Sequence, residues 1–340
     1  MNVLHEKVMS LFEQHHGSSP SFVVRSPGRV NLIGEHTDYN EGFVFPLAIE
    51  NATWIALRPR ADQVINLFSA DHGESVLIHL DHIQRDAMNW REYPKGVVHV
   101  LQSLGHNILG WEGVTLCDVP MGAGLSSSAS FELAVARACT EVSGIPWDGL
   151  RMAQAAQQAE NEWVGVKCGI MDQLISALGQ EGHALFIDCR SLDAQPARLP
   201  TGTAVLILDT MTRRGLVESA YNERRAQCRT AAMHFGVTAL RDVSLELFEA
   251  HADELDPMVR KRARHVITEN RRTCDAFTAM QNDDATALGA LMDASHVSLR
   301  DDFEVTNHAL NTMVSLVRAH VGCLGARMTG AGFGGCAVAL

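Results

Sequence analysis

The chain has 340 residues, of which 46% are hydrophobic and 20% charged, and its formal net charge is −12. This length allows two domains with buried cores, and the composition is that of a globular protein, not of a disordered or collagen-like chain. Nucleic acids and anionic membranes are bound mainly through Lys and Arg, so the acidic balance argues against both as partners. A phosphate ligand stays possible, because it needs only a local positive site.

The eight cysteines are scattered, and no pair has the C-x-x-C spacing of a zinc site. The N-terminal sequence MNVLHEKVMSLFEQHH has apolar residues at helical spacing, which predicts an amphipathic helix that ends at Gly17 and not a signal peptide. The sequence contains no run of about 18 apolar residues, as a membrane span would require. We therefore expect a cytoplasmic protein with reduced thiols.

The first half of the chain predicts a sheet followed by helices. β-rich runs occur at 22–24, 43–49, 53–57, 64–68 and 75–80. After them come a helix at 95–104, a strand at 114–119, helices at 128–142, 152–163 and 171–178, a strand at 184–187 and an apolar run at 204–208.

The second half is mostly helical, with helices expected at 256–280, 284–299 and 307–320. The first of these carries Val259, Ala263, Val266 and Ile267 on one face, with its arginines expected outside. A glycine-rich turn and a short apolar strand end the chain. We expect an α+β fold of two tightly joined lobes, with mixed sheets and helices and without a flexible linker.

A phosphate-binding loop is predicted at Val119–Ser130, where VPMGAGLSSSAS joins a strand to a helix. Glycines let backbone N–H groups approach an anion, and the helix N-terminus adds partial positive charge. The loop is not a Walker A motif, since G-x-x-x-x-G-K-[ST] does not occur in the chain. A serine-rich helix N-cap is the alternative interpretation.

A second glycine cluster, Gly330–Gly335, matches G-x-G-x-x-G, but only five residues follow it. No helix can begin there to receive a pyrophosphate, so dinucleotide binding is excluded. We expect a tight turn whose backbone packs against a ligand or another loop.

Two further segments carry candidate functional groups. The segment from Arg25 to Asn40 gathers Arg29, Glu35, His36 and Asp38 between β-rich runs, which suits a polar ligand such as a sugar but also a solvated loop. Asp172 lies at the start of a helix, where the dipole favours its ionised form and it could deprotonate a hydroxyl. The alternative is that Asp172 serves only as a helix-terminal charge. Glu160, upstream, is either a metal ligand or a residue on a solvated face.

These segments together resemble the galactokinases of the GHMP kinase family. The resemblance rests on GRVNLIGEHTDYNEG at 28–42, GAGLSSSAS at 122–130, GIMDQ at 169–173 and MTGAGFGGCAV at 328–338. It extends through HALFIDCRSL at 183–192 and SLRDDFEVT at 298–306, and so covers nearly the whole chain.

The resemblance implies roles for individual residues. Asp172 corresponds to the catalytic base, and Arg29 to the residue that keeps it ionised and stabilises the transferred phosphoryl group. The positions that contact the sugar correspond to Glu35, His36, Asp38, Gly169 and Tyr221. The ATP-binding positions correspond to Trp90, in the adenine pocket, and to Gly122, Ala123, Gly124, Leu125, Ser126, Ser127 and Ser128. The magnesium ligands correspond to Ser128 and Glu160.

The resemblance also implies a two-lobe GHMP kinase fold with its active site between the lobes, an N-terminal domain at 1–190 and a C-terminal domain at 191–340. The implied activity is ATP- and Mg²⁺-dependent phosphorylation of α-D-galactose at O1, the entry step of galactose catabolism. The alternatives are a kinase for a related sugar such as N-acetylgalactosamine, or a non-catalytic sensor of galactose and ATP. The partners expected are galactose and ATP, without nucleic acid or membrane, in a monomer or weak homodimer. Relatives continue beyond the position of Leu340, so we expect the strand at 336–340 to lack a neighbour.

Overall fold

The computed structural model describes residues 3–86, 89–213 and 217–340, with the side chains of 217–219 excluded. The chain forms two compact units, each built from several segments. Unit 1 comprises Met1–Gly28, Ile49–Pro120 and Ser126–Leu178, and unit 2 comprises Arg29–Ala48, Met121–Leu125 and Gly179–Leu340. The expected domains at 1–190 and 191–340 remain a prediction.

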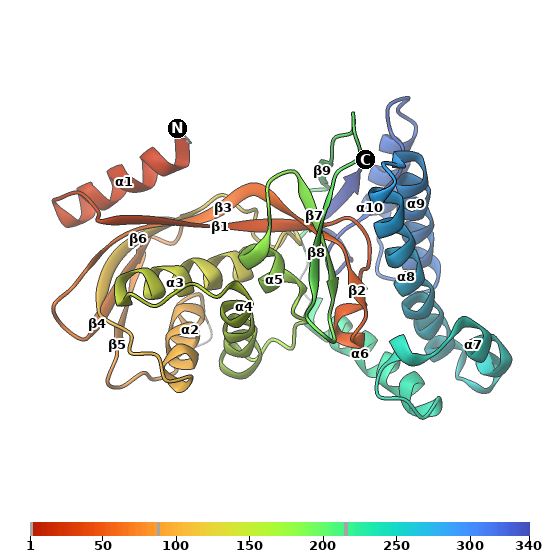
Figure 1. Cartoon of the computed structure of the whole chain (residues 1–340), viewed down its shortest axis with the longest axis horizontal. Helices are drawn as coiled ribbons and strands as arrows, with labels where there is room; N and C mark the ends of the chain where they lie inside the picture. Colours follow the sequence, from red (N-terminus) through yellow and green to blue (C-terminus); the bar gives the residue numbers. More distant parts are fainter. Residues whose placement is uncertain (1–2, 87–88, 214–216) are drawn as a thin grey trace. The chain divides into compact units, whose positions relative to one another are not determined.

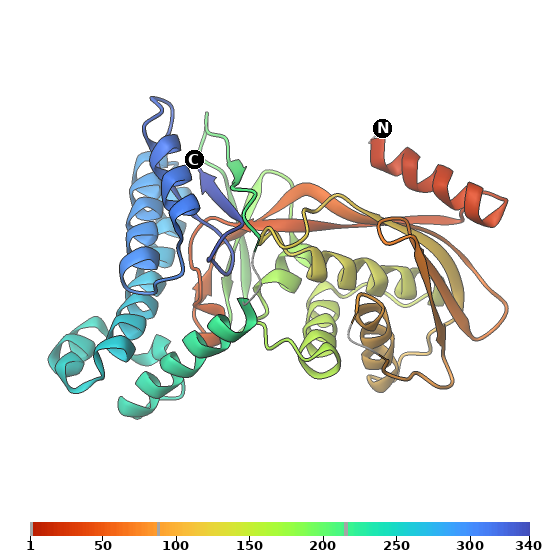
Figure 2. The same cartoon turned by 180° about the vertical axis from the view of Figure 1, so that it is seen from behind.

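Unit 1 combines a sheet with helices (Figures 1 and 2). Two long strands, β1 (Phe22–Asn31) and β3 (Pro46–Pro59), contribute residues to both units. The other elements of unit 1 are α1 (Val3–His16), β4 (Val64–Ser69), β5 (Glu74–His79), α2 (Glu92–Ser103), β6 (Trp111–Cys117), α3 (Ser127–Ser143), α4 (Gly149–Gln158), the π-helix η2 (Ala159–Val164) and α5 (Met171–Leu178). β6 pairs antiparallel with β3 and parallel with β4, and β5 extends the sheet antiparallel to β4.

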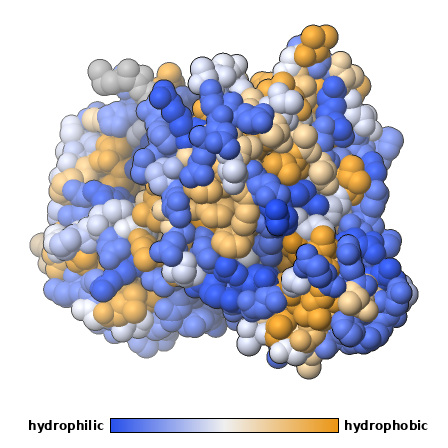
Figure 3. Space-filling model, turned by 45° about the vertical axis from the view of Figure 1, so that its right-hand side comes forward, coloured by the Kyte–Doolittle hydropathy of each residue, from blue (hydrophilic) through white to orange (hydrophobic). Residues whose placement is uncertain are grey.

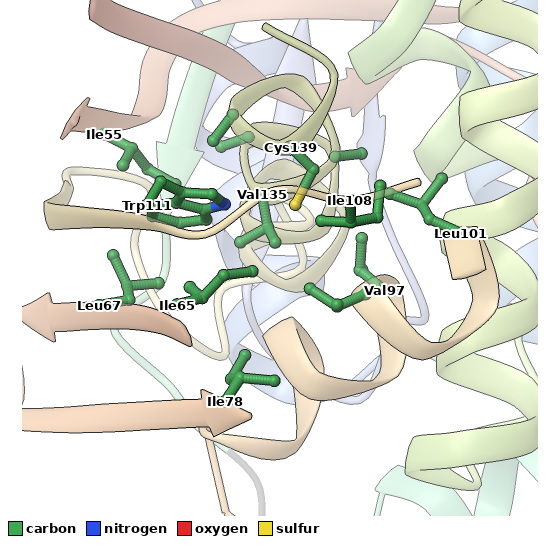
Figure 4. Close-up of a cluster of buried hydrophobic side chains, with 14 of the residues drawn as sticks. Ile55, Ile65, Leu67, Ile78, Val97, Leu101, Ile108, Trp111, Val135 and Cys139 are labelled. Atoms are coloured by element: carbon green, nitrogen blue, oxygen red, sulfur yellow. The ribbon is translucent and has the colours of Figure 1, made fainter. Parts of the chain in front are cut away.

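Alternating side chains of β3 serve the two faces of this sheet, as the period of two in a strand requires. Ile55 and Leu57 enter a core built with α2, α3 and α4 (Figure 4). Trp54 and Ala56 point to the other face, where the buried side chains of α1 cover them. The sheet of unit 1 therefore lies between α1 and the other helices.

Unit 2 contains a second set of strands and most of the later helices. Its elements are the 3₁₀-helix η1 (Asp38–Asn40), β2 (Phe43–Val44), β7 (His183–Asp188), β8 (Ala194–Arg198), β9 (Leu206–Asp209), α6 (Val217–His234), η3 (Leu240–Asp242), α7 (Leu245–His251), η4 (Ala252–Glu254), α8 (Pro257–Gln281), α9 (Ala285–Asp301), α10 (His308–Arg318), β10 (Ala326–Met328) and β11 (Cys336–Ala339). β7 pairs with β2, with β8 and with the first residues of β3. α8 packs against α9 and against α6.

The last strand differs from its prediction. β11 pairs antiparallel with β10 on one side and with β9 on the other, so it is the central strand of a three-stranded sheet. The expectation of an unpaired edge at 336–340 is therefore wrong. The apolar run predicted at 204–208 contributes the neighbour, since Leu206 lies opposite Ala339.

Several boundaries also differ. The runs at 43–49 and 53–57 are largely one strand, β3, and β1 continues to Asn31 through residues expected to form a loop. The helix predicted at 152–163 is α-helical only to Gln158 and then becomes the π-helix. Arg262 of α8, expected outside, is 1% exposed and bonds to Gln227 and Glu304. The helix predicted at 171–178 has the bounds of α5.

The surface is largely polar on the face in Figure 3, where hydrophilic residues surround smaller hydrophobic areas. Within the described ranges, no helix is long and apolar enough to cross a membrane. All eight cysteines fall within those ranges and are free thiols.

Leu101 and Leu104 test the importance of the core in Figure 4, because both lie at the end of α2. Leu101 is fully buried and Leu104 is 54% exposed. Leu101→Ala should lower the free energy of unfolding by about 2–5 kcal/mol, since it leaves a cavity. Leu104→Ala should change it by less than about 0.5 kcal/mol. Urea titration followed by circular dichroism measures both, and equal losses would show that Leu101 is not part of a tightly packed core.

Candidate active site

The predicted phosphate loop connects β6 to α3. Gly122, Gly124 and Ser126 all have positive φ angles, of 67°, 77° and 61°, and α3 begins at Ser127. The first N–H groups of a helix have no partner within the helix, so they are available to an anion. Ser130 fixes the first turn of α3, because its hydroxyl bonds to Thr53 and to the carbonyl of Ser26.

The second glycine cluster packs against this loop within unit 2. A Cβ on Gly335 would lie 2.5 Å from the carbonyl oxygen of Ala123, and one on Gly330 would lie 2.8 Å from that of Gly124. The two backbones thus approach more closely than any side chain would allow. The expected tight turn that packs against another loop is confirmed.

Arg29 braces the same loop. Its side chain is buried, and Nη1 donates to the carbonyl of Gly124 at 2.5 Å. Its backbone N–H donates to the carbonyl of Leu125 at 3.1 Å. Arg29 is therefore fixed directly beside the predicted phosphate loop.

Asp172, the expected base, is the second residue of α5 in unit 1. Its Oδ2 accepts a hydrogen bond from the hydroxyl of Ser126, at the N-cap position of α3. The Ser126 side chain does not cap its own helix. The structure therefore joins the candidate base to the first serine of the predicted phosphate loop, 46 residues away.

Glu160 and Ser128, the expected magnesium ligands, also lie together in unit 1. Glu160 is 5% exposed, so its interpretation as a solvated residue is wrong. Its carboxylate accepts hydrogen bonds from Gln173 Nε2 at 2.7 Å and from the Cys168 thiol at 3.2 Å. Ser128 is close enough to Glu160 to lower the pKa of that carboxyl. The π-helix that carries Glu160 is a form found often at functional sites.

Sequence reasoning missed Glu132, a fully buried residue of α3. Its Oε2 accepts from Gln173 Nε2 at 3.3 Å, while its Oε1 has no hydrogen-bond partner. Burial raises the pKa of Glu132 well above its ordinary value, and the negative charges of Glu160 and Asp172 raise it further. Burial likewise raises the pKa of Glu160. The position of Glu132 in an Ala-rich helix gave no signal that it is buried beside Gln173.

The carboxylate of Glu35, in unit 2, is almost completely buried. Its Oε1 accepts from the N–H of Gly330 at 2.6 Å and from Thr329 Oγ1 at 3.2 Å. Arg327, itself 0% exposed, lies 3.6 Å away. Burial raises the pKa of Glu35, and the positive charges of Arg327 and Arg29 oppose this rise.

His36 follows with a φ of 62°. Burial lowers the pKa of His36 to about 3, so its ring is neutral at physiological pH. Nε2 lies 3.3 Å from the carbonyl of Ala331 and must carry the proton, because a carbonyl only accepts. Nδ1 then accepts from the hydroxyl of Tyr39 at 2.9 Å. The ring centroids of Tyr221 and His36 are 5.6 Å apart, so unit 2 brings these expected sugar contacts together.

The remaining candidates are divided between the units. Asp38 begins η1 in unit 2 and accepts from the N–H of Tyr39 at 2.9 Å. Gly169 lies two residues before α5 in unit 1. Trp90, also in unit 1, stacks on the ring of His72 with 5.2 Å between centroids.

The described side chains near Glu160 offer few ligands for a metal ion. In the described part of the chain, no group of three or more His, Cys, Asp or Glu side chains gathers to hold a metal ion. Glu160 and Ser128 nevertheless offer a carboxylate and a hydroxyl oxygen, the hard ligands that Mg²⁺ prefers.

The fold and these segments define a GHMP kinase. Models of the GHMP kinase N-terminal and C-terminal domains match residues 92–180 and 276–340, and a model of the galactokinase galactose-binding signature matches residues 10–59. The crystal structure of Lactococcus lactis galactokinase complexed with galactose is 38% identical, with a TM-score of 0.94, over 100% of this chain and 90% of that one. The chain therefore belongs to the galactokinase family.

More distant structures share only the fold. Methanococcus jannaschii mevalonate kinase is 18% identical, with a TM-score of 0.67, over 95% of this chain and 90% of that one. Streptococcus pneumoniae phosphomevalonate kinase, in complex with phosphomevalonate and AMPPNP, is 11% identical, with a TM-score of 0.66, over 94% and 91%. The predicted α+β GHMP kinase fold is confirmed.

Gly34 provides a test of the backbone at the candidate sugar site. Its φ is +93°, and a Cβ there would lie 2.6 Å from the carbonyl oxygen of Phe43. Gly236, also in unit 2, has a φ of +66° but open space around it. Gly236→Ala should cost roughly 1–2 kcal/mol of stability through its φ alone. Gly34→Ala should cost about 1–3 kcal/mol more, because of the clash. Urea unfolding compares the two variants, and equal losses would contradict the tight approach at Gly34.

Proposed function

We propose that this protein is a galactokinase, which transfers the γ-phosphoryl group of ATP to O1 of α-D-galactose and releases ADP. The observation that carries the proposal is the match to the galactose-binding signature over residues 10–59, which contain Glu35, His36 and Asp38. The full-length similarity to a galactokinase that was crystallised with galactose supports the same substrate. The use of ATP as phosphate donor follows from membership of the GHMP kinase family.

Asp172 acts as the general base in this proposal. It accepts the proton of the O1 hydroxyl while O1 forms a bond to the γ-phosphorus, and the bond from that phosphorus to the bridging oxygen of ADP breaks. The hydrogen bond from Ser126 fixes the orientation of the Asp172 carboxylate. Arg29, braced by the loop carbonyls, stabilises the charge of the transferred group.

Sugar recognition rests with Glu35, His36, Asp38, Gly169 and Tyr221. The two nitrogens of the His36 ring already bond to Ala331 and Tyr39, so this ring lines the site in a fixed orientation. The buried Glu35 carboxylate offers a strong acceptor. A site built from directed groups rejects isomers whose hydroxyls point elsewhere, since its own polar atoms are then unpaired. Glucose, which differs at C4, should therefore be a poor substrate.

The residues around the phosphate loop fit ATP with Mg²⁺. Residues 122–128 provide backbone N–H groups and serine hydroxyls for the phosphates, and Trp90 an aromatic surface for adenine. Glu160 and Ser128 would hold Mg²⁺ through a carboxylate and a hydroxyl oxygen. The Oε1 of Glu132 is a further buried oxygen, without a hydrogen-bond partner. The ion, when bound, neutralises charge on the β- and γ-phosphates. We also propose a cytoplasmic location and a monomer or weak homodimer.

Two alternatives remain weaker. A kinase for N-acetylgalactosamine would share the fold and the phosphate loop. A non-catalytic sensor would lack the machinery for transfer, whereas this chain keeps Ser128-Ala129 and Asp172.

Asp172→Asn tests the proposed base. The amide is isosteric with the carboxylate, so the fold should persist, while kcat for galactose should fall about 10²- to 10⁴-fold. The control is Asp148→Asn, at the exposed N-cap of α4, where an amide oxygen can still accept from Arg151 N–H and kcat should not change. Coupled measurement of ADP release gives kcat for each protein. An Asp172→Asn enzyme with wild-type kcat would rule out the general base.

Glu160→Gln and Ser128→Ala test the proposed magnesium ligands. Each should raise the Mg²⁺ concentration for half-maximal activity by about tenfold or more, because Mg²⁺ uses few protein ligands. Glu162→Gln, at an exposed position of the same π-helix, is the control and should leave the Mg²⁺ concentration for half-maximal activity unchanged. Mn²⁺ binding in the presence of ADP, followed by electron paramagnetic resonance, gives an activity-independent readout. Unchanged Mn²⁺ affinity in both variants would exclude these residues as ligands.

A further inference from the structure

One face of α8 holds the backbone of residues 34–43, the segment that carries the candidate sugar contacts. Glu269 Oε1 accepts hydrogen bonds from the N–H of Gly34 at 3.0 Å and of Glu35 at 3.4 Å. One turn earlier, His265 Nε2 lies 3.1 Å from the carbonyl of Glu35. Asn270 Oδ1 accepts from the N–H of Phe43 at 3.0 Å. All these groups belong to unit 2.

Glu269 carries a full negative charge although it is completely buried. Burial would raise its pKa, but Arg272, His265 and Arg327 together lower the pKa of Glu269 to about 2. Arg272 Nε donates to its Oε2 at 2.8 Å, and the Ser295 hydroxyl donates to its Oε1 at 2.6 Å. Hydrogen bonds to an ionised acceptor are stronger than those between neutral groups. The two backbone amides therefore face a fixed and strong acceptor.

The backbone from Gly34 to His36 needs stabilising contacts from outside the segment. The φ angles of Gly34 and His36 are 93° and 62°, and the second lies in a region that non-glycine residues seldom adopt. Strained backbone persists only where surrounding contacts determine it. The side chains of Glu35 and His36 leave directly from this stretch, so its backbone sets their direction.

We propose that Glu269 is a positioning residue for sugar binding: its carboxylate fixes the Gly34–Glu35 peptide and thereby the direction of the Glu35 and His36 side chains. This inference rests on the proposed function, in which those two residues contact galactose. Glu269 itself does not touch the substrate. Its loss should weaken galactose binding far more than ATP binding.

Glu269→Gln tests the proposal, because the amide keeps the volume but replaces one acceptor oxygen by a donor. Gly34 N–H, Glu35 N–H, Ser295 and Arg272 all donate to this side chain, so an NH₂ group must face a donor. We expect KM and Kd for galactose to rise about tenfold or more, as the loss of hydrogen bonds to a charged group predicts. KM for ATP and kcat at saturating galactose should change less than about threefold.

Ser295→Ala is the matched control. It removes a hydrogen bond to the same carboxylate oxygen but leaves the contacts of Glu269 with both backbone amides. Its KM for galactose should remain within about twofold of wild type. An equal rise in both variants, or an equal rise in KM for ATP, would mean that Glu269 only stabilises the fold and would overturn the proposal.

A second variant and a second readout keep the test decisive. If Glu269→Gln does not fold, Glu269→Asp retains the charge and retracts it by one methylene, and it should still raise KM for galactose without affecting KM for ATP. Amide hydrogen exchange of the peptide that spans residues 32–37 measures, without any substrate, how well this backbone is protected. Exchange should be faster in either variant than in the wild type. Unchanged exchange would overturn the positioning role. Faster exchange in a protein whose wild type does not bind galactose would instead refute the proposed function alone.

Discussion

The left-handed turn at residues 34–36 is the constraint around which unit 2 is organised. Gly34 fits because a Cβ would meet the carbonyl of Phe43, and the turn directs Glu35 into a buried site beside Arg327. Several distant segments converge to hold it. In the glycine turn, the N–H of Gly330 donates to the Glu35 carboxylate. From α8, the Glu269 carboxylate accepts from the N–H of Gly34. The buried carboxylates are tolerated here because Glu35 is paired with Arg327 and Glu269 with Arg272, and both accept hydrogen bonds.

Unit 1 is organised around buried carboxyl groups. Gln173, next to Asp172 in α5, uses its single NH₂ group to bond both Glu132 and Glu160. Negative charges placed so close together and away from water raise one another's pKa, as the shifts of Glu132 and Glu160 indicate. Carboxyl groups with strongly perturbed pKa values cluster at functional sites. They lie in the same unit as Ser126–Ser128 of the predicted phosphate loop.

The sequence predicted the parts of the site that have local signals. The glycine-rich loop before α3, the glycine turn and α5 follow from small-residue and helical patterns over a few positions, and the structure has all three elements. Phosphate binding by the loop stays a prediction. Residues that reach these segments only through long-range contacts had no such signal. Glu132 resembled any polar residue of a helix, and Glu269 was hidden among the arginines of α8. The pairing of β11 with β9 could not be inferred either, because the two strands lie more than a hundred residues apart in the chain.

The identity of the phosphorylated product tests the central claim most directly. Incubation with ATP, Mg²⁺ and D-galactose, followed by ³¹P and ¹H NMR, identifies both the sugar and the carbon that bears the phosphate. We expect α-D-galactose 1-phosphate, recognised by coupling of the phosphorus to the anomeric proton, with glucose converted at least about a thousandfold more slowly. Phosphate on another carbon, or conversion of N-acetylgalactosamine but not galactose, would contradict it.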